Sequence, residues 1–308
     1  MKKSFFSAKV LLFGEYGILK NSSGLSIPYN IYNGTLKIHS EFNRDILYSN
    51  YEIKKFYNFL SILEKKKINS IKLDLNKLSQ DIQKGMFFYS NIPIGYGLGS
   101  SGALVAAIYD KYKKDKLKGC LKNNILILKK IFSQMESFFH GKSSGIDPLI
   151  CYLNKPLLIR SKTDISIIRI PKKDQGKRAV FLLNSETPSK TNFMIQFFFR
   201  KLKQDKFKKI FFIEFMNYNE KCIKFFLKED FDKFLKNVKS LSTWVLKHFR
   251  PMISDKLLKI WENGLFNNIY YLKLCGSGGG GFFLGFTPNY DLSRKELKKY
   301  AIEVLFRF

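Results

Sequence analysis

Residues 91–112 (NIPIGYGLGSSGALVAAIYDKY) have the spacing of an anion-binding loop followed by a helix. The loop residues concerned are Gly95, Gly97, Leu98, Gly99, Ser100 and Ser101. Glycine lets the backbone adopt positive φ and approach a ligand closely. The unpaired N–H groups of a helix N-terminus favour phosphate, and a serine there can cap the helix or reach nucleotide-bound magnesium. The loop therefore predicts a phosphate site. The alternative is a glycine-rich turn with serine caps.

Two other nucleotide-binding patterns compete with this interpretation of the loop. A literal G-x-G-x-x-G occurs at Gly97, Gly99 and Gly102. The dinucleotide-binding fingerprint normally opens the first βαβ unit and needs an acidic residue about 20 positions later. Here the loop comes only after residue 90, and the segment KDKLKGCLKNN after it has no well-placed acid. A Walker loop is excluded because no G-K-[ST] closes the glycine run.

A pair of carboxylates lies in residues 135–148 (MESFFHGKSSGIDP). Glu136 stands near the end of an apolar helical run, and Asp147 follows in a turn. An inward-facing carboxylate beside a phosphate loop can bind magnesium, and a second one can accept the proton of a substrate hydroxyl. We interpret His140, between them, as structural rather than catalytic. Alone, such a pair says little, since most Asp and Glu lie on solvated faces.

A second glycine tract lies in residues 273–286 (KLCGSGGGGFFLGF). Gly278, Gly279 and Gly280 stand between two apolar, strand-like runs. So many glycines between strands indicate a backbone kept bare for the close approach of another group. A flexible hairpin is the alternative interpretation.

The elements that must position these residues follow from hydrophobic periodicity. Strands are expected at 5–13, 34–42, 70–75, 86–93, 155–160, 165–170, 178–184, 268–275 and 281–287. Helices are expected at 101–113, 124–139, 191–203, 208–228, 230–249 and 253–264, and residues 293–304 close as a helix or a strand. A strand-rich first part and a helix-rich second part predict an α+β fold of two domains, 1–162 and 163–308.

Length and composition favour a cytoplasmic globular protein. The 308 residues, 45% of them hydrophobic, suffice for about two domains. No window reaches the roughly 18 unbroken apolar residues that a membrane helix needs. The first 19 residues resemble a signal peptide, but Lys9 and Glu15 interrupt the apolar run and no cleavage site follows. The four cysteines form no C-x-x-C pair, which disfavours a zinc site and a disulfide framework.

The formal net charge of +29 raises the question of a nucleic-acid partner. Lysine is spread over the whole chain together with abundant Phe, Ile and Asn, all of which have A/T-rich codons. We therefore favour compositional drift and disfavour nucleic-acid binding. The charge would still attract anionic small substrates.

The three motifs together resemble the superfamily of galactokinase, homoserine kinase, mevalonate kinase and phosphomevalonate kinase (GHMP kinases). They occur in the family's order and span nearly the whole chain: SAKVLLFGEYGIL (7–19), PIGYGLGSSGA (93–103) and KLCGSGGGG (273–281). Within the superfamily the chain is most similar to mevalonate kinase, since it has E-x-x-x-H-G-x-x-S-G-x-D at 136–147. It also has SETPSKT at 185–191, close to that enzyme's T-x-x-P-x-x-T.

The resemblance implies a fold, two cofactors and a set of site residues. The N-terminal ATP-binding domain would be similar to domain 2 of ribosomal protein S5, and the C-terminal domain would be ferredoxin-like, with the active site between them. ATP and Mg²⁺ would be the reagents. By match, Ser101 and Glu136 would hold magnesium, Asp147 would be the catalytic base, and Lys9 would lie beside it. The glycine-serine loop would cradle phosphates, and Gly278 to Gly280 would form the floor near phosphates and substrate.

The chain departs from the family pattern at several positions. The first motif lacks the usual proline and glycine before its lysine, and Tyr16 stands where mevalonate kinases often have histidine. The second motif has Tyr96 where a small residue is common and Gly102 where alanine is usual. Ser189 replaces an arginine that often binds the substrate carboxylate, and Lys190 offers a point charge instead of a bidentate fork. These changes leave the kinase prediction intact and bear on the substrate.

The sequence therefore predicts an ATP-dependent kinase that phosphorylates mevalonate to 5-phosphomevalonate in isoprenoid precursor synthesis. The substrate would be mevalonate or a related anionic alcohol, and a homodimer stays open. Phosphomevalonate kinase or another GHMP kinase is the first alternative. A non-catalytic nucleotide- or nucleic-acid-binding protein is the alternative from another class. The intact Lys9, Ser101, Glu136 and Asp147 argue against it.

Overall fold

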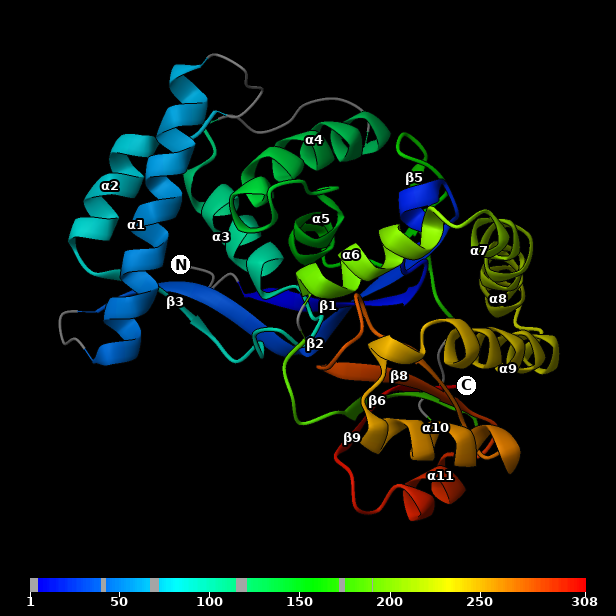
Figure 1. The fold of residues 1–308 in the computed structure, drawn as a ribbon. Coiled ribbons are helices and arrows are strands. Elements are labelled where there is room, and N and C mark those ends of the chain that lie inside the picture. The colour runs from blue at the N-terminus through cyan, green and yellow to red at the C-terminus, as the bar shows by residue number, and fades with distance from the viewer. Residues whose placement is uncertain (1–4, 40–42, 67–71, 115–120, 172–174, 190) are drawn as a thin grey trace. The chain divides into compact units, whose positions relative to one another are not determined.

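The computed structural model describes residues 5–39, 43–66, 72–114, 121–171, 175–189 and 191–308 (Figure 1). Its strands are β1 Phe6–Phe13, β2 Gly24–Ile38, β3 Met86–Ser90, β4 Leu157–Ile159, β5 Ile165–Ile167, β6 Ala179–Asn184, β7 Tyr271–Leu274, β8 Phe282–Thr287 and β9 Ile302–Arg307. Its α-helices are α1 Arg44–Lys65, α2 Leu75–Gln83, α3 Ser100–Tyr112, α4 Leu121–His140, α5 Ile146–Leu153, α6 Thr191–Leu202, α7 Asp205–Ile210, α8 Met216–Leu227, α9 Phe231–His248, α10 Asp255–Phe266 and α11 Tyr290–Glu296. A π-helical segment, Phe211–Phe215, joins α7 to α8, and short 3₁₀ turns occur at Ile18–Lys20 and Arg250–Met252.

The chain forms two compact units, each built from several stretches of sequence. The first unit contains residues 1–9, 27–93 and 99–155, and the second contains residues 10–26, 94–98 and 156–308. The chain therefore passes between the units within β1, within β2, twice around the glycine-serine loop and once just before β4. The domain boundary expected between residues 162 and 163 stays a prediction.

The first unit has a helical core beside a short stretch of antiparallel sheet. Gly34–Ile38 of β2 pairs with Met86–Ser90 of β3. Helices α3, α4 and α5 pack on one another (Figure 1) and bury the small side chains Ala103, Ala106 and Ala107 of α3. Small residues on one face let neighbouring helices approach closely, which brings the first turn of α3 next to the start of α5.

Helix α1 lies beside β3 and covers one edge of that strand. The Ser49 hydroxyl accepts a hydrogen bond from the Phe88 amide at 3.0 Å. The Asn50 side-chain amide donates to the Met86 carbonyl at 2.7 Å and to the Ile82 carbonyl at 3.0 Å. The bonds to Phe88 and Met86 satisfy backbone groups of β3 that do not face β2.

The second unit is organised around a four-stranded antiparallel sheet in the order β7-β8-β6-β9 (Figure 1). Helices α9 and α10 pack against β7, and α8 packs against α9. The core of this unit is rich in aromatic side chains; Phe181, Phe226, Phe234 and Trp261 are fully buried. In the same unit, Gly24–Ser26 of β2 pairs with β4, and β4 pairs with β5.

The α+β fold class is confirmed, and several element predictions need correction. No strand forms at the described part of 70–75, where Leu73 makes a single β-bridge to Lys113 and α2 begins at Leu75. Helices α1, α2 and α5 were not expected. Residues 293–304 contain both the end of α11 and the start of β9. In the described part of the chain, no helix combines the length and apolarity that spanning a membrane requires.

Candidate active site

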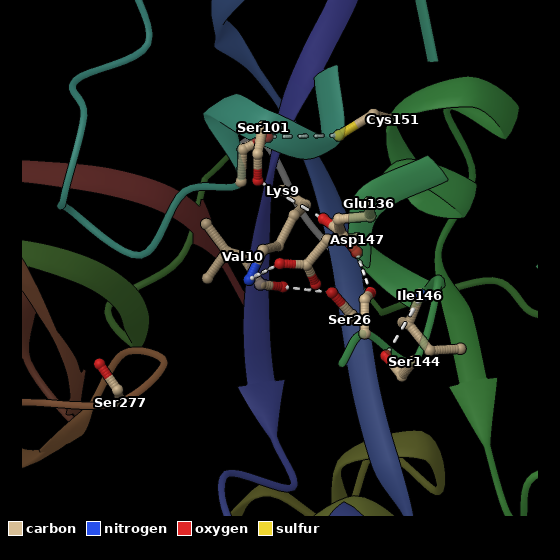
Figure 2. A network of polar contacts seen from close by, with 12 residues as sticks. Lys9, Val10, Ser26, Ser101, Glu136, Ser144, Ile146, Asp147, Cys151 and Ser277 are labelled. Carbon is tan, nitrogen blue, oxygen red and sulfur yellow. Dashed lines mark hydrogen bonds and ion pairs between the residues drawn. The ribbon is translucent and has the colours of Figure 1, made fainter. Parts of the chain in front are cut away.

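In the first unit, a buried lysine forms an ion pair with a carboxylate at the start of a helix. Lys9 on β1 lies 2.9 Å from Asp147 on α5, measured from Nζ to Oδ2 (Figure 2). The Lys9 side chain is 6% exposed and the Asp147 side chain is 38% exposed. Asp147 was expected in a turn, but it lies in the first turn of α5, where the helix dipole favours a negative charge. The pair thus has a buried cation and a carboxylate that another molecule can reach.

The glycine loop packs directly against this lysine. Gly99 has a φ of +76°, and a Cβ built on it would lie 2.9 Å from the Cγ atom of Lys9. A side chain at residue 99 would therefore be strained by its backbone and would push Lys9 aside. Gly99 is also the N-cap residue of α3, and no side chain caps that helix. The first amides of α3 consequently begin next to the Lys9–Asp147 pair.

Gly102 accounts for the close approach of α3 and α5. A Cβ on Gly102 would lie 2.9 Å from the Asp147 carbonyl carbon and 2.9 Å from the Pro148 nitrogen. Because these are backbone atoms, neither can move away by a change of rotamer. Glycine at this position, where the family usually has alanine, thus has a steric reason in this chain.

Gly102→Ala is expected to destabilise the protein although alanine is the better helix former. The gain in helix propensity is about 1 kcal/mol, whereas overpacking against fixed atoms costs about 1–3 kcal/mol. Chemical denaturation should show a lower free energy of unfolding for the variant. A variant that is more stable than the wild type, as propensity alone would give, would show that α3 and α5 are not in the contact described.

A second carboxylate, Glu136 near the end of α4, is almost completely buried beside this pair (Figure 2). Burial, followed by the negative charge of Asp147, raises the pKa of Glu136 to about 8. Ser143 donates a hydrogen bond to Glu136 Oε2, and the Ser101 hydroxyl lies 3.5 Å from Glu136 Oε1. Hydroxyls thus surround the carboxylate on both sides without supplying a full positive charge.

His140 is closer to the site than its structural interpretation suggested. Its Nε2 atom lies 3.1 Å from the Ser101 hydroxyl. Desolvation lowers the pKa of His140 below its ordinary value, and Lys9 acts in the same direction against the charge of Asp147. A neutral imidazole whose Nε2 atom carries no proton can accept a hydrogen bond from the Ser101 hydroxyl.

The donor set around Glu136 fits a hard divalent cation. Its carboxylate and the Ser101 hydroxyl are oxygen ligands of the kind that Mg²⁺ prefers, and a raised pKa marks a buried charge that lacks compensation. Among the residues the structure describes, no three His, Cys, Asp or Glu side chains cluster as a metal site. Magnesium does not require such a cluster, because it commonly takes one or two carboxylates together with substrate phosphates.

In the second unit, the early part of the glycine-serine loop meets two other motifs. Gly95 and Gly97 have φ of +83° and +78°. A Cβ on Gly97 would lie 2.7 Å from the Cys275 carbonyl oxygen. The Gly95 carbonyl accepts a hydrogen bond from the Ser189 amide at 2.8 Å. Leu98, which ends this stretch, is buried. Residues 94–98, the SETPSKT segment and the glycine tract therefore lie together.

The glycine tract itself requires residues without side chains. Gly278, Gly279 and Gly280 have φ of +74°, +78° and +146°. A Cβ on Gly280 would lie 2.7 Å from the carbonyl oxygens of Thr187 and Pro188. The sequence predicted that another group approaches this bare backbone closely. In the structure, the group that approaches Gly280 is the backbone of Thr187 and Pro188.

The predicted site residues therefore fall into two groups, each within its own unit. Lys9, Gly99, Ser100, Ser101, Glu136 and Asp147 belong to the first unit, and Gly95, Gly97, Leu98, Gly278, Gly279 and Gly280 belong to the second. The sequence analysis missed Ser143, whose position between the two acids was its only signal. Lys190 lies outside the described residues, as does Cys120, while the other three cysteines are buried and are not in disulfide bonds.

Comparison with known proteins finds one matching family model and several similar folds. The family model described as the GHMP kinases N terminal domain matches residues 65–155. The solved structure of L. major mevalonate kinase in complex with R-mevalonate is 16% identical, covers 99% of this chain and 95% of its own, and has a TM-score of 0.64. Lactococcus lactis galactokinase complexed with galactose is also 16% identical, with coverages of 97% and 92% and a TM-score of 0.64. Streptococcus pneumoniae phosphomevalonate kinase, in complex with phosphomevalonate and AMPPNP, is 14% identical, with coverages of 99% and 99% and a TM-score of 0.63. No curated protein sequence matches the chain.

The whole-chain similarity to these solved structures shows that the chain has the two-domain α+β fold of small-molecule kinases. Residues 65–155 match the model of the GHMP kinases N terminal domain, and the three motifs in order extend the resemblance to that superfamily over the rest of the chain.

Proposed function

We propose that the protein is an ATP-dependent kinase that transfers a phosphoryl group to the hydroxyl of a small molecule, in the role of a mevalonate kinase. The observation that carries this proposal is the Lys9–Asp147 ion pair in contact with the glycine that opens α3, with Ser101 and Glu136 beside it. Phosphoryl transfer depends mainly on positioning and charge neutralisation, and this arrangement supplies groups for both.

Asp147 is proposed as the acceptor of the substrate hydroxyl proton. Its Oδ2 atom is paired with Lys9, so Oδ1 is the atom left to take the proton. Lys9 stabilises the negative charge that develops on the attacking oxygen. Because the Lys9 side chain is buried and confined by Gly99, it keeps this position without help from a ligand.

The nucleotide would be held by the glycine-serine loop and the start of α3. The backbone amides at Ser100 and Ser101 follow Gly99 without a side-chain cap and would face the phosphates. Ser101 and Glu136 would hold Mg²⁺, which neutralises phosphate charge when bound. Ser143 and His140 would orient these two ligands through their hydrogen bonds. Gly278 to Gly280 would border the phosphates and substrate.

Mevalonate is the proposed substrate because the acid loop at 136–147 and the SETPSKT segment follow the mevalonate kinase pattern. The fold similarity to L. major mevalonate kinase supports this choice. The similarly high likeness to a phosphomevalonate kinase keeps phosphomevalonate as the second candidate. We propose a cytoplasmic location for the reaction, and a homodimer stays open.

A coupled ADP-release assay tests the proposal directly. The purified chain would be assayed with ATP and Mg²⁺ against mevalonate, phosphomevalonate, homoserine and galactose in parallel. We expect turnover with mevalonate to exceed turnover with the other three alcohols by at least about 100-fold, since a site built around one substrate rejects poorly matched ones strongly. Preferred turnover of another alcohol would replace the substrate, and no turnover with any of them would reject the kinase proposal for these acceptors.

A further inference from the structure

A buried ion pair in the second unit has no role in the chemistry proposed above. Glu15, in the turn after β1, lies 2.5 Å from Lys273 on β7, and their side chains are 5% and 4% exposed. Lys273 Nζ also donates to the Leu274 carbonyl at 3.0 Å. Burying two charges costs desolvation, and apolar residues of similar volume often serve stability equally well. Stability alone therefore does not explain why charges occupy this position.

The position of the pair in the sequence suggests another role. Lys273 precedes the glycine tract by three residues, and Glu15 precedes Tyr16. The Tyr16 hydroxyl donates to the Ser277 carbonyl, inside the tract, at 2.6 Å. Two links, one ionic and one through a hydroxyl, thus join residues 15–16 to residues 273–277.

Tyr16 is itself held firmly enough to act as an anchor. Its ring packs against Phe198 at 4.5 Å and against Phe249 at 5.5 Å between centroids. Its side chain is buried, which with the charge of Glu15 raises the pKa of its hydroxyl. The hydroxyl therefore stays protonated and remains a hydrogen-bond donor across the pH range in which most proteins are folded.

The tract needs such anchors because Ser277, which hydrogen-bonds to Thr191 at 3.2 Å, is its only residue with a side chain. Glycine has no side chain to pack and loses more conformational freedom on folding than any other residue. Within the tract, the Gly279 amide donates to the Met252 carbonyl at 2.7 Å, and the Gly281 amide donates to the Thr187 carbonyl at 2.6 Å. These bonds, with the one that Ser189 donates to the Gly278 carbonyl, hold the tract from Gly278 onward. Tyr16 holds the Ser277 carbonyl, and Lys273 fixes the end of β7 that leads into the tract.

We propose that Glu15, Tyr16 and Lys273 form a clamp that fixes the glycine tract, residues 276–281, in the conformation its function requires. They are positioning residues, since they act through the tract and not on reacting atoms. An effect of the clamp on catalysis rests on the proposed function, in which the tract lies beside phosphates and substrate. An effect of the clamp on the conformational order of the tract does not depend on that proposed function.

Two variants, Glu15→Met/Lys273→Met and Tyr16→Phe, separate an effect on the position of the tract from an effect on stability. Single replacements of Glu15 or Lys273 by Met leave a buried charge without its partner and should lower the melting temperature by on the order of 10 °C. The double variant Glu15→Met/Lys273→Met removes both charges and should regain most of that loss. Tyr16→Phe keeps the aromatic packing and removes only the hydroxyl link to Ser277. Lys256→Ala is the matched control, because it breaks an exposed Lys–Glu pair, with Glu186, in the same unit.

Hydrogen exchange followed by mass spectrometry provides the direct readout. In the double variant and in Tyr16→Phe, we expect a peptide covering residues 275–281 to exchange about 10-fold faster or more. Loss of one hydrogen bond lowers the free energy of local opening by about the amount that this factor requires. Strand β8 should keep its protection, and Lys256→Ala should match the wild type throughout. Unchanged exchange of the tract in a folded double variant and in Tyr16→Phe would overturn the clamp.

Kinetics then distinguish this inference from the proposed function. If the wild type turns over, both clamp variants should lose about 10-fold in kcat/KM while melting close to the wild type. Folded variants with wild-type kcat/KM would reduce the clamp to a structural contact. If the wild type phosphorylates none of the alcohols, the proposed function fails, whereas the exchange result still decides whether the clamp orders the tract.

Discussion

Asp147→Asn is expected to lower turnover by about 10³-fold or more while leaving nucleotide affinity within a few-fold of the wild type. The amide cannot take the proton of the substrate hydroxyl, and it no longer neutralises Lys9, which lies 2.9 Å away. General base catalysis and the electrostatic arrangement around it typically contribute roughly 10²–10⁴-fold each, so loss of both should be large. Nucleotide binding, which we propose relies on the loop amides, should be largely retained.

The measurement is steady-state turnover combined with calorimetric titration of AMPPNP and Mg²⁺. Asp110→Asn is a matched control, because Asp110 also pairs with a lysine, Lys113, in the first unit. It stands near the end of α3, about 13 Å along the helix from Ser101. Turnover in the Asp147 variant within about 10-fold of the wild type would contradict the assignment of the base. Equal losses in both variants would point to a general effect of removing surface charge.

Glu136→Gln is expected to remove a pH dependence of stability and to abolish stabilisation by magnesium. The pKa of Glu136 is raised from an ordinary value of 4.5 to about 8 in the folded chain. Between these two values the folded state keeps a proton that the unfolded state releases. The free energy of unfolding therefore falls as pH rises, by up to about 1.4 kcal/mol per pH unit for this group, and the loss levels off above pH 8.

Chemical denaturation of the metal-free protein between pH 5 and pH 9 tests this sign. The wild type should lose on the order of 3 kcal/mol relative to the Glu136→Gln variant over this range. Magnesium with a nucleotide should raise the melting temperature of the wild type more at pH 8 than at pH 5.5, because the cation compensates the ionised carboxylate. Parallel pH profiles for the two proteins would mean that Glu136 is not the buried acid described, and equal metal responses would remove it from the ligand set.

The sequence predicted the glycine conformations well and the contacts between distant residues poorly. Gly95, Gly97 and Gly99 adopt positive φ, as their spacing before a helix suggests. The α+β class follows from hydrophobic periodicity, and the resemblance to GHMP kinases follows from three motifs in order, one of which lies in the segment that the family model matches. These features are local in the sequence, so they can be found without knowledge of the fold.

What the sequence could not show depends on packing. Helix α1 was missed because its apolar residues surround the helix, and only Ile53, Phe56 and Leu60 become fully buried. Asp147 was placed in a turn because the short helix α5 is apolar on most sides and has no periodic stripe. The Glu15–Lys273 pair joins residues 258 positions apart, and no local pattern announces such a contact.

The cover that α1 places over β3 has a consequence for association with other chains. An open strand edge can recruit a strand from another molecule and so start a growing intermolecular sheet. Because Ser49 and Asn50 already occupy the Phe88 amide and the Met86 carbonyl, an incoming strand would have to displace both side chains before it could pair there. Two short polar side chains thus disfavour intermolecular strand pairing, and the aggregation that follows from it, at this edge.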